Sequence, residues 1–105
     1  MILQAATESD GTLKLAILTD TLDISNETAF REECNASVAD STGPVELDCS
    51  KLNFIDSSGV GALLHINKLL SAERRPVKLT GVQPKVITLL ELMHVHRSFE
   101  IEAGN

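Results

Sequence analysis

The sequence has no tryptophan and no tyrosine, and aromatic residues make up only 3% of it. Proteins that read single-stranded nucleic acid usually stack the bases on aromatic rings, so the composition argues against that class. The formal net charge of −6 adds to this argument, because an acidic surface repels phosphate backbones and anionic lipid surfaces alike. We therefore expect neither nucleic acid nor a membrane as a direct partner.

Long apolar runs are also lacking, and none approaches the roughly 20 residues of a membrane span. The first residues lack the basic stretch and the apolar stretch of a secretion signal. The two cysteines, Cys34 and Cys49, fall in different expected elements and do not form a metal-ligand pair. They are typical of reduced intracellular thiols, and we expect a cytoplasmic location.

The length of 105 residues, with 43% hydrophobic and 23% charged residues, predicts a single globular domain over residues 1–105. A chain of this size buries one core, which favours one layer of helices on one sheet.

Hydrophobic periodicity predicts an opening hairpin, with strands near residues 2–6 and 13–18 joined by an Asp10-Gly11 turn. Helices near 27–40, 60–74 and 84–93 then alternate with strands near 45–49, 77–79 and 99–102. The expected order is β-β-α-β-α-β-α-β. This is an α/β fold with a single mixed sheet, antiparallel at the hairpin and parallel thereafter, covered by helices.

A polar turn, Asp56-Ser57-Ser58-Gly59, stands where an expected strand ends and an expected helix begins. In α/β proteins ligands and chemistry gather at this end of the strands. Aspartate and serine here can accept hydrogen bonds from the first turn of the helix. A phosphate on Ser57 would meet the positive end of the helix dipole. From these residues alone the turn is either a plain helix cap or a docking point.

The helix that follows has an apolar arc of roughly 220°, much wider than the ~100° stripe of a typical surface helix. Part of the arc is expected to pack on neighbouring helices, and the rest to form an exposed patch for a partner that includes Val60 and Leu64. Glycine lacks a side chain, so Gly59 and Gly61 are expected to leave the backbone open to close approach by another protein.

Residues 47–64, LDCSKLNFIDSSGVGALL, resemble the signature of STAS domains, the anti-sigma factor antagonists. The resemblance implies a domain that binds an anti-sigma factor and so frees a sigma factor. In this family the anti-sigma factor is usually also a serine kinase, and it phosphorylates the serine directly after the motif aspartate, which is Ser57 here. A metal-dependent phosphatase reverses the step. The kinase supplies ATP and Mg²⁺, so the resemblance implies no cofactor for this chain.

The resemblance also assigns Asp23 and Asp56 to acidic positions beside the acceptor, and Ser58 and Gly59 to the contact turn. An alternative within the family is a constitutive STAS subunit of a phospholipid-transport ABC complex or another signalling assembly. Those transport subunits tend to carry Thr-Ala where this chain has Ser57-Ser58, so the serine pair favours the phosphorylation switch.

Enzymatic motifs are incomplete. A hydrolase elbow needs Gly-x-Ser-x-Gly, but Ile55 stands where the first glycine of that motif belongs. His94 and His96 offer two metal ligands where a site needs three or four. We expect no catalytic residue, no metal site and no enzymatic activity.

Overall fold

The opening hairpin forms as predicted in the computed structural model, which describes residues 1–104. Strand β1 (Leu3–Thr7) pairs antiparallel with β2 (Leu13–Ile17). The turn between them needs a residue in the left-handed region, and Gly11 supplies it with a φ of 92°. Residue 105 of the expected domain lies outside the described residues.

Strands and helices then alternate along the chain. Strands β4 (Val45–Asp48), β6 (Val77–Val82) and β7 (Glu100–Ala103) extend the sheet in parallel, giving the order β1-β2-β4-β6-β7. The crossovers contain α1 (Glu27–Ala39), α2 (Ser57–Ala72) and α3 (Pro84–Leu92), the last followed by the 3₁₀ helix η1 (His96–Ser98). The predicted α/β fold with one mixed sheet is confirmed.

A second, two-stranded sheet was not predicted. Strands β3 (Thr21–Leu22) and β5 (Phe54–Ile55) pair in parallel outside the main sheet. Each is two residues long, which is too short for an alternating pattern to show in the sequence. Helix α2 also begins at residue 57, about one turn earlier than expected, because Asp56 caps it.

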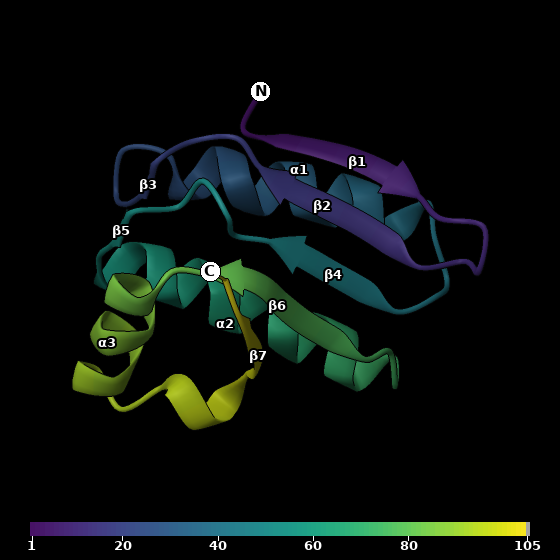
Figure 1. Cartoon of the computed structure of the whole chain (residues 1–105). Coiled ribbons are helices and arrows are strands. Elements are labelled where there is room, and N and C mark those ends of the chain that lie inside the picture. Colours follow the sequence, from purple (N-terminus) through teal and green to yellow (C-terminus); the bar gives the residue numbers. More distant parts are fainter. Residues whose placement is uncertain (105) are drawn as a thin grey trace.

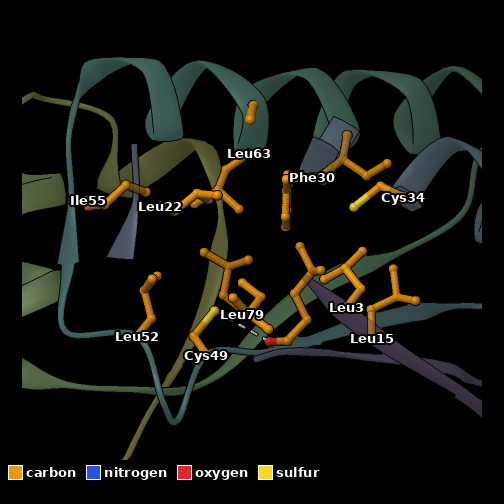
Figure 2. Packing of buried hydrophobic residues seen from close by; sticks show 14 of the residues in the cluster. Leu3, Leu15, Leu22, Phe30, Cys34, Cys49, Leu52, Ile55, Leu63 and Leu79 are labelled. Carbon is orange, nitrogen blue, oxygen red and sulfur yellow. Dashed lines mark hydrogen bonds between the residues drawn. The ribbon is translucent and has the colours of Figure 1, made fainter. Parts of the chain in front are cut away.

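The core lies between the main sheet and the helices. Figure 1 shows α1 and α2 behind the sheet on one side, with α3 at one end of it. Leu13, Leu15 and Ile17 alternate along β2 and are all buried, as a strand with one covered face requires. Figure 2 shows Phe30 of α1 and Leu63 of α2 packed over these strands.

A buried arginine joins the ends of the two covering helices. Arg75 is 7% exposed. Its Nε donates to the carbonyl oxygen of Gly43 at 2.8 Å, its Nη1 to that of Val38 at 3.1 Å, and its Nη2 to Ser41 Oγ at 2.7 Å. These bonds satisfy carbonyl and hydroxyl groups at the end of α1 and in the loop after it, from a residue three positions beyond the end of α2.

Candidate functional site

The two short strands bring the two predicted acidic residues together. Leu22 is paired with Ile55, and Figure 2 shows these two side chains at one end of the core. Asp23 and Asp56 follow them directly, so the parallel register carries both to the same end of the small sheet. The structure thus unites residues that lie far apart in the sequence.

Asp56 links the turn to the neighbouring loop. Its Oδ1 accepts from the backbone N–H of Gly59 at 2.9 Å, which caps α2. Its Oδ2 accepts from the N–H of Ile24 at 3.3 Å, and its own N–H donates to the Leu22 carbonyl at 3.2 Å. One carboxylate therefore fixes both the start of the helix and the loop after β3.

Asp23 organises that loop. Its Oδ1 accepts from the Ser25 hydroxyl at 2.5 Å and from the Ser25 N–H at 2.9 Å, and these bonds hold the pKa of Asp23 below its usual value. The N–H of Asp23 donates to Asn26 Oδ1 at 2.9 Å. Asn26 therefore closes the loop with its side chain, although it stands at the cap position of α1.

Ser57 is exposed at the first position of α2, and Ser58 is half-buried beside it. Within residues 1–104, the backbone N–H groups of these two residues donate no hydrogen bond. They are two of the orphan donors at a helix start. An anion on the Ser57 side chain would therefore find free donors and the positive end of the helix dipole.

Gly59 does not leave the backbone open, and that expectation is wrong. The residue is buried, and a Cβ atom added to it would lie 2.2 Å from the carbonyl oxygen of Leu22 and 2.7 Å from Ile55 Cγ1. Gly59 is needed because the start of α2 packs directly against both strands of the small sheet. Gly59 therefore contacts Leu22 and Ile55 of its own chain and is not open to a partner protein.

The predicted exposed patch on α2 is also wrong in its larger part. Val60 is 5% exposed and belongs to the core, and Leu64 is half-buried and packs against it. Gly61 is half-buried and faces Arg31 of α1. The wide apolar arc is explained by burial on two sides, against the sheet and against α1.

Two apolar residues that the sequence reasoning missed are exposed at this end of the molecule. Ile24 is 77% exposed and lies in the loop that Asp56 holds, and Phe54 is 47% exposed on β5. The strand alternation contained a signal for Phe54, because the residue before a buried Ile55 points the other way. Together with Asp23 and Ser57 they form what we call the switch surface.

The comparisons with known proteins agree with this architecture. The family model for the STAS domain matches residues 4–104. No curated protein sequence matches the chain. Within residues 1–104 no helix has both the length and the apolar character needed to cross a membrane.

Three solved structures illustrate the likeness in fold. An anti-sigma-factor antagonist (STAS) domain protein of Planctomyces limnophilus is 14% identical, with 98% of this chain and 91% of that chain covered and a TM-score of 0.85. The anti-sigma factor antagonist SpoIIAA in its unphosphorylated form is 19% identical, with 96% and 88% covered and a TM-score of 0.75. SpoIIAA of Bacillus in its phosphorylated form also matches, with a TM-score of 0.69.

The murine anion transporter Slc26a9 is 16% identical over 90% of this chain but only 16% of that chain, with a TM-score of 0.74. The same fold thus occurs both as a small protein and as a segment of a transporter. With the family model covering all but the ends of the sequence, the chain belongs to the STAS domain family.

Proposed function

We propose that this chain is a phosphorylation-switched anti-sigma factor antagonist. The unphosphorylated form binds a kinase-type anti-sigma factor through the switch surface and releases a sigma factor, and phosphorylation of Ser57 ends the binding. The observation that carries the proposal is the exposed Ser57 hydroxyl at the capped start of α2. It is beside two free backbone donors and within an acidic, partly apolar surface.

The fold tolerates a phosphate at Ser57. The group adds a charge of about −1.5 to −2, and the helix start offsets part of this through its dipole and the free N–H groups of Ser57 and Ser58. Asp56 already accepts two hydrogen bonds and has no need to move. The free protein should therefore keep its fold when it is phosphorylated.

A partner bound to the same surface responds differently. Ile24 and Phe54 offer apolar contact, while Asp23 and Asp56 favour a basic counterpart. A phosphate on Ser57 would lie between these contacts. Either it loses its hydration water when the partner binds, which costs free energy, or it keeps the water and leaves a gap in the interface, and both weaken binding. The switch then acts at the interface without refolding of this chain. A metal-dependent phosphatase would restore binding.

A second candidate is a constitutive STAS subunit of a transport assembly, such as a phospholipid-transport ABC complex. The similarity to a segment of an anion transporter favours it. In that role the same surface would be a permanent interface, and Ser57 would only be the first residue of α2, behind the Asp56 cap. The two candidates therefore differ in what a charge at Ser57 does to binding.

The experiment is affinity capture from the native host with the unmodified chain, followed by phosphosite mapping after incubation with the captured partner and ATP. We expect a protein with an ATP-binding serine kinase domain, and phosphate on Ser57. A Ser57→Ala variant should still bind but accept no phosphate, and Ser58→Ala should behave as the parent does. Capture of transporter subunits with no phosphate transferred would overturn the proposal in favour of the second candidate.

A further inference from the structure

One edge of the main sheet has backbone groups without partners. β1 is the outer strand, and its bonds to β2 fix which groups face outward. The N–H of Glu8 donates to the carbonyl oxygen of Thr12, and the N–H of Leu18 donates to that of Ile2. The backbone groups of the even-numbered residues within β1 therefore face β2. In an antiparallel ladder the facing direction alternates. Residues 3, 5 and 7 therefore direct their N–H and C=O groups away from the sheet.

Only part of that outward row is already used. Leu3, the first residue of that row, donates its N–H to Glu33 Oε1 at 3.0 Å. The N–H of Ile2, just before β1, also donates to this carboxylate, at 3.0 and 3.1 Å. Within residues 1–104, the outward N–H groups of Ala5 and Thr7 donate to no acceptor. These two residues thus offer four free backbone groups to a strand that adds to the sheet.

The two edges of the sheet differ in how they are protected. β7, at the other edge, carries Glu100 and Glu102, and charged side chains are a common means of preventing strand addition. β1 has the sequence LQAAT, with no charge and no proline. A second β7 would place glutamates near glutamates, whereas a second β1 meets no charge on the strand itself.

The surface beside β1 is hollowed where it meets α1. Hollows of about 390 and 190 Å³ lie between β1 and α1, and both are lined by Ala5 and Ser37. Ala36 of α1 and Asp40, the residue after α1, complete the rim. The small side chains in the middle of this helix face allow the same helix of a second molecule to come near when two β1 strands pair about a two-fold axis.

We propose that two copies of this chain dimerise by antiparallel pairing of their β1 strands, which joins the two main sheets into one. The register follows from the free groups. Ala5 of each copy exchanges both backbone hydrogen bonds with Thr7 of the other, which pairs all four free groups of each copy. A register centred on Ala5 leaves the Thr7 carbonyls without donors, because the Leu3 N–H is held by Glu33.

This register places Ala6 opposite its own equivalent on the two-fold axis, as a pair whose side chains are close. Within one copy Ala6 is opposite Lys14. Further across the open face the same row continues with alternating charges: Lys14, Glu46, Lys78 and Glu100. A glutamate at position 6 would extend this alternation in the monomer but repel its equivalent in the dimer.

The test is sedimentation equilibrium of the 105-residue chain and its variants. For the parent we expect a mass that rises with concentration from 11.3 kDa towards twice that value. Ala6→Glu should weaken the dimer at least about tenfold, because two carboxylates meet at the axis, and urea unfolding should show no loss of monomer stability. Ala103→Glu, the same change at the other edge, should leave the dimer intact.

A mixture of Ala6→Glu and Ala6→Lys decides the register. The two variants should form a heterodimer that is tighter than either homodimer, since opposite charges then meet at the axis. A parent chain that stays at 11.3 kDa at every concentration would overturn the proposal. So would a dimer that Ala6→Glu leaves unchanged, or one that Ala103→Glu disrupts.

Discussion

Gly59 is the position at which the switch surface depends most on the absence of a side chain. A Cβ atom at this position would lie 2.2 Å from the Leu22 carbonyl oxygen, about 0.8 Å inside the closest approach that real Cβ atoms show. The obstacle is backbone, which cannot rotate away as a long side chain can. Gly59→Ala must therefore move the start of α2 away from β3.

The expected loss can be worked from these contacts. Overpacking a close-packed site costs about 1–3 kcal/mol. Movement of the helix start also weakens the cap between Asp56 and the Gly59 N–H, which is 2.9 Å long and contributes about 1 kcal/mol. Alanine recovers up to about 1 kcal/mol over glycine within a helix. We expect Gly59→Ala to lower the free energy of unfolding by about 1–3 kcal/mol.

Gly61→Ala, two residues further along the same helix, is the matched control. A Cβ there would lie 3.4 Å from Nη2 of Arg31, the far end of a flexible side chain. This variant should gain up to about 1 kcal/mol. Urea unfolding followed by far-ultraviolet circular dichroism measures both, since the chain has no tryptophan or tyrosine for fluorescence. A Gly59→Ala variant as stable as the parent, or equal losses in the two variants, would refute the packing argument.

Three further predictions concern the remainder of the fold. Arg75→Met should lower the free energy of unfolding by about 2–4 kcal/mol, because it removes the charged donors from buried and partly buried acceptors at and just after the end of α1; an unchanged urea midpoint would show that these bonds contribute nothing. Arg74→Gly and His94→Gly should each raise stability by up to about 1 kcal/mol in the same assay, because both residues have φ of 58°; a loss in either would contradict this. Burial raises the pKa of Cys34 and Cys49 from 9.0 to about 12, so the unfolded state binds fewer protons between these values, and stability should fall as pH rises above about 9. A flat profile from pH 9 to 12 in urea unfolding would contradict the burial of the thiols.

The sequence predicted the main sheet well because its signals are local. Alternation in β2 and the helical spacing of Phe30, Cys34 and Val38 reflect one covered face, and each can be seen in a short window. The strand–turn–helix arrangement around Asp56 was predicted for the same reason. The pairing of β3 with β5 could not be predicted from the sequence. Each strand contributes only two residues, and the pairing depends on where segments far apart in the sequence meet.

The positions of the acidic residues and of Ser57 were predicted, whereas the packing around them was not. Asp23 and Asp56 do lie at the same end of the small sheet, and Ser57 is exposed. Burial on two sides of α2 cannot be read from one helix, so Gly59 and Val60 were expected at the surface and are in the interior. Ile24 was missed because a single apolar residue in a loop carries no pattern.

A charge at Ser57 is proposed to control binding, and calorimetric titration of the captured kinase with matched variants tests this most directly. Ser57→Asp should weaken binding by at least about 1–3 kcal/mol, through lost contact and charge repulsion, while Ser57→Ala should bind as the parent does. Circular dichroism should show both variants folded as the parent is. Equal affinity of Ser57→Asp and the parent would contradict the account.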